Sequence, residues 1–129
     1  MRNKQAKKNI VKPAVYIESS VISYYKSRFS RDLIAAAHQQ ITQDWWLNVL
    51  PELEPYISKA VLDEISKGDP DASKERLNAV KSFQVLDITP LAISLADEYI
   101  AAIKIPGRAE ADAYHLAIAV SHGIDYFVS

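Results

Sequence analysis

Three acidic residues lie far apart in this sequence, each beside an apolar segment that is typical of a protein core. Glu18 follows the apolar run 14–17, Glu64 lies within a predicted helix, and Asp112 opens an alanine-rich segment. In a fold with helices layered on a parallel sheet, such positions can converge at the edge formed by the carboxyl ends of the strands. The sequence therefore predicts a carboxylate cluster able to hold a divalent metal ion.

A convergent trio of carboxylates needs a cation. Two unit charges about 5 Å apart repel by about 3 kcal/mol at an effective dielectric near 20. Three such pairs raise pKa values or separate the side chains unless a metal neutralises them. Ligands that are all oxygen favour Mg²⁺ or Mn²⁺, which polarises a phosphoryl oxygen and orients a water molecule. Phosphate ester hydrolysis is the chemistry that such a site predicts.

Each acid also has an ordinary structural explanation. Glu18 can accept backbone N–H groups at a strand end, and Glu64 can pair with Lys59 or Lys67 on a helix surface. Asp112 can be a first-turn acid that the helix dipole favours. Spacing alone does not decide between these explanations and the metal site.

The elements that must position the acids can be read from the apolar pattern. Continuous apolar runs, rather than alternating ones, predict strands buried on both faces of a parallel sheet. These runs are Ala14–Ile17, Tyr56–Ile57, Val85–Ile88 and Tyr126–Val128. Helical patterns separate them, so we predict a three-layer α/β/α sandwich with a parallel sheet of about four strands.

Local signals fix several helix ends. Ser58, Asp69 and Thr89 are predicted N-caps, and Gly123 is predicted to end the last helix. Apolar residues at four-residue steps from Leu33 to Val49 predict one apolar stripe on a long helix. Glu18 then lies directly at the sheet edge, and the helix from Ser58 carries Glu64 about 9 Å along its axis from that edge.

Composition limits the class of protein. With 129 residues, 49% hydrophobic and 24% charged, the chain predicts one ordinary globular domain rather than a disordered protein. It has no apolar segment of the roughly 18 residues needed to span a bilayer, and no cysteine for disulfides or thiolate sites. No apolar core follows the basic start, as a secretion signal requires. We therefore expect a cytoplasmic protein with no membrane partner.

The first twelve residues form a separate unit by charge. Residues 1–12 carry five basic side chains and no acid. Such a segment is either a flexible, solvated leader or a basic arm that contacts phosphates. We expect residues 1–12 to be a flexible basic tail and residues 13–129 to be the folded domain.

Three stretches of sequence carry a family resemblance. They are VYIESSVI at 15–22, VLDEI at 61–65, and ADAYHLA at 111–117 followed by GIDYFV at 123–128. In this order they resemble the PIN-domain family of metal-dependent ribonucleases, and more closely its small prokaryotic members, the VapC-like toxins of toxin–antitoxin pairs. The resemblance covers residues 13–129.

The resemblance implies roles for particular residues. Glu18, Glu64 and Asp112 stand where the family's metal-binding, catalytic acids stand. Ser20, and less closely Ser19, stand where a hydroxyl follows the first acid and can bind a metal water or a phosphate; helix capping is the alternative for Ser19.

Two further positions have weaker roles. His115 follows Asp112 by one turn, where it can orient that carboxylate, touch substrate or simply pack. Arg31, together with Arg28, is a candidate for phosphate contacts, with surface charge as the alternative.

The sequence departs from the family pattern at two points. The first acid is Glu18, where most of the family has Asp, and the extra methylene moves the carboxylate by about 1.5 Å. The family also has another acid or amide after the strand at 126–128, whereas this sequence stops at Ser129. We therefore expect the domain to lack its C-terminal end, which puts full activity in question.

Two functions follow as hypotheses. The first is an endoribonuclease dependent on Mg²⁺ or Mn²⁺, the toxin of a type II pair, with RNA as substrate, an antitoxin protein as partner and a homodimer as its assembly. The alternative is a weakly active or inactive PIN-like module that binds RNA or a protein. A phosphatase with an aspartyl nucleophile is disfavoured, because Glu18-Ser19-Ser20 lacks both aspartates of that chemistry.

Overall fold

Four strands form one parallel sheet at the centre of the molecule. The structure, a computed structural model, describes residues 11–103 and 108–129, so most of the predicted basic tail lies outside the described residues. The sheet order is β3-β2-β1-β4, and every neighbouring pair is parallel. The strands are β1 (Ala14–Ile17), β2 (Glu54–Ser58), β3 (Gln84–Leu86) and β4 (Tyr126–Val128).

The helices connect successive strands. They are α2 (Ser19–Lys26), α3 (Leu33–Asn48), α4 (Lys59–Ile65), α5 (Pro70–Ala79), α6 (Pro90–Ile103) and α7 (Arg108–Ser121), with a short 3₁₀ helix η1 (Leu50–Glu52) before β2. Within the two described ranges, none of these helices has the length and apolar character needed to cross a membrane.

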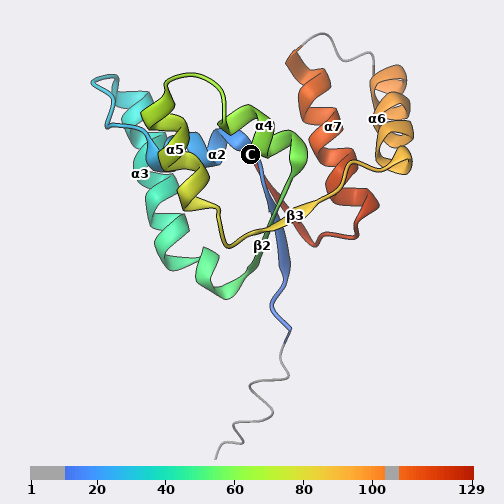
Figure 1. Cartoon of the computed structure of the whole chain (residues 1–129), viewed down its shortest axis with the longest axis horizontal. Coiled ribbons are helices and arrows are strands. Elements are labelled where there is room, and N and C mark those ends of the chain that lie inside the picture. Colours follow the sequence, from blue (N-terminus) through green and yellow to red (C-terminus); the bar gives the residue numbers. More distant parts are fainter. Residues whose placement is uncertain (1–10, 104–107) are drawn as a thin grey trace, which may run out of the picture.

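The direction of the crossovers produces three layers. The connections β1 to β2 and β2 to β3 step the same way across the sheet, whereas β3 to β4 steps back past β1. Because such crossovers are right-handed, the reversal places the last helices on the opposite face. Figure 1 shows α2, α3 and α5 on one side of the strands and α6 and α7 on the other. The predicted α/β/α sandwich is confirmed.

This reversal also marks a place for a ligand. Strands β1 and β4 are neighbours. The crossover that leaves β1 and the crossover that arrives at β4 lie on opposite faces of the sheet, which marks the switch point where open α/β sheets bind ligands. We call the edge at the carboxyl ends of β1, β2 and β4 the rim; it is marked by Glu18, Ser58 and Val128. The C-terminus labelled in Figure 1 lies at this rim.

The prediction of strands buried on both faces holds for β1 and the end of β2 but is wrong for the edge strands β3 and β4, where Val85 and Tyr126 are 43% and 57% exposed. Val15, Tyr16, Ile17 and Ile57 are all fully buried. The ring of Tyr16 stacks on Phe127 of β4, with centroids 5.4 Å apart. Burying Tyr16 also places its polar hydroxyl inside the core, where it must find a hydrogen-bond partner.

The predicted helix ends are confirmed. The side chains of Ser58, Asp69 and Thr89 accept hydrogen bonds from the amides of residues 61, 72 and 92, at 3.3, 2.9 and 3.2 Å. Helix α7 ends before Gly123, whose φ of 68° lies in the left-handed region that favours glycine.

An apolar stripe on a helix is expected to face the core, but much of the stripe of α3 lies at the surface. Leu33 and Ile41 are 85% and 66% exposed, and the buried residue of this helix is Gln39. Helix α3 packs on α2 through other positions, such as Trp46, whose ring stacks on Tyr25 at 4.1 Å. Periodicity identified the helix but not the face that it buries.

Candidate active site

Glu18 stands at the junction of β1 and α2. Its backbone N–H donates to Val128 O at 3.0 Å, and its extended backbone makes it the N-cap residue of α2. The side chain is only 7% exposed. Strand β1 ends at Ile17 and helix α2 begins at Ser19, so Glu18 is the single residue that connects them.

The carboxyl group of Glu18 is poorly satisfied. Oε1 accepts a long hydrogen bond of 3.5 Å from the Ser20 hydroxyl, whereas the buried Oε2 has no hydrogen-bond partner among the described residues. Burial raises the pKa of this carboxyl above its ordinary value; His115 opposes the shift, and the charges of Asp112 and Glu64 add to it. A buried oxygen without a donor is costly, so this site favours a proton or a cation.

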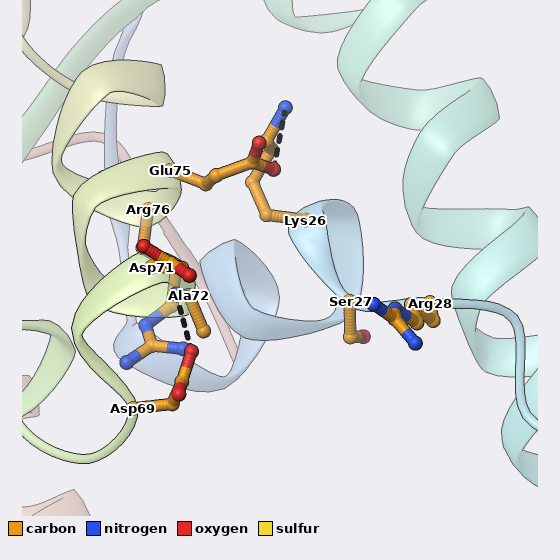
Figure 2. A pocket seen from close by; sticks show the side chains of 8 residues that line it. All are labelled: Lys26, Ser27, Arg28, Asp69, Asp71, Ala72, Glu75 and Arg76. Atoms are coloured by element: carbon orange, nitrogen blue, oxygen red, sulfur yellow. Dashed lines mark hydrogen bonds and ion pairs between the residues drawn. The ribbon is translucent and has the colours of Figure 1, made fainter.

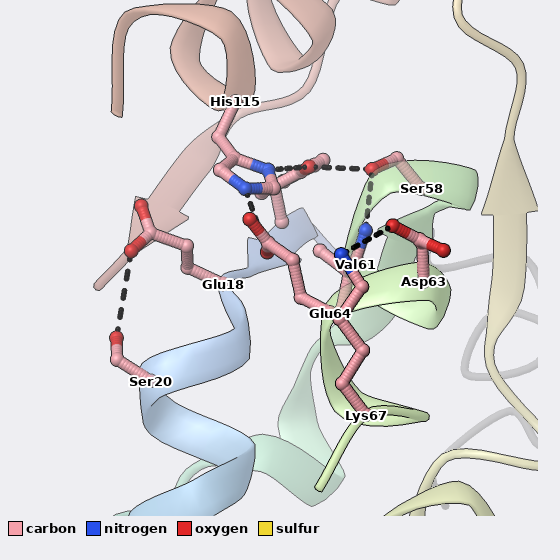
Figure 3. Close-up of polar contacts among 9 residues, drawn as sticks. Glu18, Ser20, Ser58, Val61, Asp63, Glu64, Lys67 and His115 are labelled. Atoms are coloured by element: carbon pink, nitrogen blue, oxygen red, sulfur yellow. Dashed lines mark hydrogen bonds and ion pairs between the residues drawn. The ribbon is translucent and has the colours of Figure 1, made fainter. Parts of the chain in front are cut away.

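Glu64 is held in the opposite way. Its Oε1 lies 2.9 Å from His115 Nε2, and its side chain is 36% exposed whereas that of His115 is 4% exposed. Figure 3 shows the two side chains meeting between α4 and α7, with Glu18 to their left in this view. His115 therefore orients Glu64, the acid on the other helix, rather than Asp112 on its own helix.

The contact continues into the core. His115 Nδ1 lies 2.6 Å from the Tyr16 hydroxyl, which lies 2.8 Å from Ser58 Oγ. Ser58 Oγ in turn accepts the amide of Val61. Burial raises the pKa of the Tyr16 hydroxyl, a hydrogen bond from Ser58 opposes this, and the charges of Glu64 and Glu18 reinforce it, so the phenol keeps its proton.

Asp112 lies on the first turns of α7 and is exposed. It is close enough to Glu18 for its charge to raise the pKa of that carboxyl, as is Glu64. The three predicted acids therefore share one electrostatic neighbourhood at the rim, although they come from positions almost a hundred residues apart.

The side chains are not already arranged as a closed metal site. Within residues 11–103 and 108–129, no three acidic, histidine or cysteine side chains lie close enough together to hold a metal ion. The donor chemistry nevertheless suits Mg²⁺ or Mn²⁺, because it is all oxygen and includes the buried, unpaired Oε2 of Glu18. The residues fit such an ion in type and charge, although among the described residues their side chains do not surround a common point.

The two serines and two arginines with predicted supporting roles lie on α2 and in the loop after it. Ser19 is the first residue of α2 rather than its cap, and Ser20 contacts Glu18. Arg31 and Arg28 are exposed in the loop between α2 and α3. Among the described contacts none joins either arginine to the acids, so their role in binding phosphates stays a prediction.

Arg28 instead lines a separate hollow of about 570 Å³ between α2 and α5. Figure 2 shows this hollow, whose charged lining residues are Lys26, Arg28, Asp69, Asp71, Glu75 and Arg76. Lys26 pairs with Glu75 at 3.8 Å, and Arg76 donates to the carbonyls of Ile65 and Lys67. Its basic and acidic groups are equal in number, so it offers no net attraction to an anion.

Tyr16 and Ser58 are site residues that we did not identify as such from the sequence. The signal for Tyr16 was available, since a hydroxyl in a strand buried on both faces must be paired. Ser58 was identified only as a helix cap. That both lead to His115 depends on the pairing of β1 with β2 and the placement of α7, which local sequence does not specify.

Comparisons with known proteins agree with this architecture. The family model of the PIN domain matches residues 15–129, whereas no curated protein sequence matches the chain. Among solved structures, the chain is similar to VapC20 of Mycobacterium tuberculosis, a toxin that cleaves the sarcin-ricin loop. The TM-score is 0.67 and the identity 16%, covering 88% of this chain and 87% of that one.

The chain is also similar to VapBC2 of Rickettsia felis, solved bound to a DNA fragment from its promoter. The TM-score is 0.57 and the identity 10%, covering 88% of this chain and 85% of that one. At these identities both likenesses show the fold alone.

Proposed function

The chain belongs to the PIN-domain family, and we propose that it is a metal-dependent endoribonuclease that hydrolyses RNA phosphodiesters. The observation that carries the proposal is Oε2 of Glu18 at the switch point of the sheet, beside the charges of Asp112 and Glu64. This oxygen is buried and has no hydrogen-bond partner in the described part of the chain. A fold alone does not define an activity. A buried carboxylate oxygen without a hydrogen-bond partner destabilises the protein, and a bound ion would explain why the site keeps one.

Glu18, Glu64 and Asp112 would hold the metal ion. Mg²⁺ or Mn²⁺ bound there would polarise the phosphoryl group and orient the attacking water. Glu64 would offer Oε2, because His115 occupies Oε1. Ser20 would keep the Glu18 carboxyl turned toward the rim.

Substrate binding falls to other groups. Arg31 and Arg28 would contact the RNA backbone from the loop after α2, since phosphate contacts supply affinity without sequence selectivity. Gln39 fixes this loop: its side chain accepts from Ser30 N at 2.9 Å and donates to Ser27 Oγ and Arg28 O at 2.9 and 2.6 Å. A fixed loop lowers the entropy lost when the arginines bind.

We further propose that the protein is the toxin of a toxin–antitoxin pair in the cytoplasm and forms a homodimer. Support for a protein interface comes from α3, where Leu33, Ile34 and Ile41 are 85%, 72% and 66% exposed. Apolar side chains gathered on one exposed helix favour coverage by a protein partner. Similarity to VapC20 and VapBC2 supports the proposal that this chain is a toxin and that its protein partner is an antitoxin.

A second candidate is a PIN-like module that binds RNA or a protein without cleaving RNA. One observation favours it: within the described ranges, the acids do not approach each other closely enough to enclose a metal ion. The two candidates differ in a single measurable property, metal-dependent cleavage.

The test is cleavage of single-stranded RNA with Mn²⁺, with EDTA, and by Asp112→Asn. We expect cleavage by the wild type with Mn²⁺, none with EDTA, and a loss of about 100-fold or more in the variant, because one ligand charge is removed. Asp63→Asn is the matched control, since Asp63 is an exposed acid paired with Lys67 on the surface of α4. Equal cleavage by Asp112→Asn and the control would refute the proposed nuclease.

A further inference from the structure

Four polar side chains form a continuous hydrogen-bonded line from the start of α4 to the rim. It runs from the amide of Val61 to Ser58 Oγ at 3.3 Å, to the Tyr16 hydroxyl at 2.8 Å, to His115 Nδ1 at 2.6 Å, and from His115 Nε2 to Glu64 Oε1 at 2.9 Å. Ser58 and Tyr16 are fully buried, and His115 is 3% exposed. Water therefore does not compete for these groups along most of the line.

The first link sets a direction. A backbone amide can only donate, so Ser58 Oγ must accept from Val61. The hydroxyl proton of Ser58 then needs an acceptor, and in its fully buried position the partner within hydrogen-bond distance is the oxygen of Tyr16. Reversing this link would leave a buried hydroxyl proton unpaired, which is costly.

The direction passes through Tyr16 to His115. Since the Tyr16 oxygen accepts from Ser58, its own proton goes to His115 Nδ1, which must be the unprotonated ring nitrogen. In a neutral imidazole the proton then lies on Nε2, where it donates to Glu64 Oε1. The backbone of α4 thus determines, through three side chains, which tautomer faces Glu64.

We propose that Tyr16 and Ser58 are positioning residues for Glu64, acting through His115 by fixing its Nε2–H tautomer. The proposal rests on the proposed function, in which Glu64 is a metal ligand. It gives Tyr16, a core residue of β1, a role in holding a carboxylate that belongs to α4.

The arrangement solves a geometric problem. Ser58 caps α4, and Glu64 is a residue of the same helix. The hydrogen-bonded line therefore contacts α4 twice, at its first turn and at the carboxylate of Glu64. Glu64 Oε1 is occupied, which leaves Oε2 as the oxygen available to a ligand. Such outer partners of a metal ligand fix its orientation, and their loss lowers metal affinity by about 10–100-fold.

The tautomer can be tested without metal or RNA. Nitrogen-15 NMR of the imidazoles distinguishes the tautomers, and the chain has 3 histidines to assign. Glu64→Gln is the informative background, because an amide can face His115 with either its oxygen or its nitrogen and so imposes no tautomer. We expect His115 to remain entirely in the Nε2–H form in Glu64→Gln.

Adding Tyr16→Phe to that background removes the hydroxyl that donates to His115 Nδ1. The double variant is expected to show both tautomers of His115, since the direction is no longer imposed. With Ser58→Ala in place of Tyr16→Phe, the Tyr16 proton still needs His115 Nδ1 as its acceptor, so the Nε2–H form is expected to remain. A mixture already present in Glu64→Gln, or a single Nε2–H form in Glu64→Gln/Tyr16→Phe, would overturn the proposal.

The positioning effect is measured separately, by calorimetric titration with Mn²⁺. Tyr16→Phe keeps the ring that stacks on Phe127 and removes the hydroxyl, so Mn²⁺ affinity is expected to fall about 10-fold. The control is Tyr56→Phe, at the paired position in β2, which should bind as the wild type does. Equal affinity of the two variants would overturn the positioning role. A protein that passes both tests but cleaves no RNA would refute the nuclease and leave this role intact.

Discussion

Two glutamates at the same rim are treated in opposite ways by the fold. Glu64 is partly exposed, yet its Oε1 is fixed by a buried histidine at 2.9 Å. Glu18 is almost fully buried, yet its Oε2 has no partner among the described residues and its pKa is raised by burial and by neighbouring acids. The fold thus stabilises one carboxylate in place and leaves the other in need of a proton or a cation. In the proposed metal site, Glu18 would therefore gain more from a bound ion than Glu64.

The same substitution made at both positions is expected to change the stability of the protein in opposite directions. Without metal at pH 7.5, Glu64→Gln should lower the free energy of unfolding by about 1 kcal/mol, because a charged hydrogen bond to His115 becomes a neutral one. Glu18→Gln should raise it by about 1 kcal/mol, because a buried and unpaired charge is removed. Urea unfolding in EDTA measures both values.

The order of Glu18→Gln and the wild type in stability should reverse when Mn²⁺ is added. Binding to the folded state alone stabilises the wild type by mass action, by about 2.7 kcal/mol at a hundredfold excess over Kd. Glu18→Gln should lose this gain and become less stable than the wild type. If both variants are destabilised equally without metal, the contrast between the two glutamates is wrong.

A smaller effect is expected in the pH dependence of stability. The pKa of Glu18 is raised in the folded protein, so the folded state holds a proton that the unfolded chain releases at lower pH. The contribution of Glu18 is therefore most favourable below its ordinary pKa of 4.5, falls as the pH rises toward the raised value, and is constant above it.

This dependence is measured as a difference between two proteins, so that other titrating groups cancel. The stability of Glu18→Gln minus that of the wild type, in EDTA, should grow as the pH rises from 4.5 to 7.5. Parallel curves for the two proteins would show that burial does not disfavour the charge of Glu18.

Local sequence predicted the parts of this fold that local chemistry controls. The strands 14–17 and 126–128 and the caps Ser58, Asp69 and Thr89 follow from apolar runs and from short polar side chains before helices. The position of Glu18 at the rim follows equally, because the residue directly after a parallel strand lies at the carboxyl edge of the sheet.

Contacts between distant elements could not be predicted in the same way. Gln39 is buried whereas Leu33 and Ile41 of the same helix are exposed, because the Gln39 amide binds the loop 27–30. Similarly, His115 pairs with Glu64 and not with Asp112, because α7 lies beside α4 at this point. Both outcomes depend on how distant helices and loops pack against one another, which cannot be predicted from the spacing of residues in the sequence.

The central claim is that the carboxyl group of Glu18 serves a metal ion shared with Glu64 and Asp112. Diffraction from crystals grown with Mn²⁺, recorded for its anomalous signal, tests the claim directly. We predict a peak at the rim with Glu18 Oε2 within about 2.3 Å, and with Glu64 Oε2 and Asp112 among the other ligands. A rim without a peak, or an ion held elsewhere while Glu18 Oε2 stays buried and unpaired, would contradict the account.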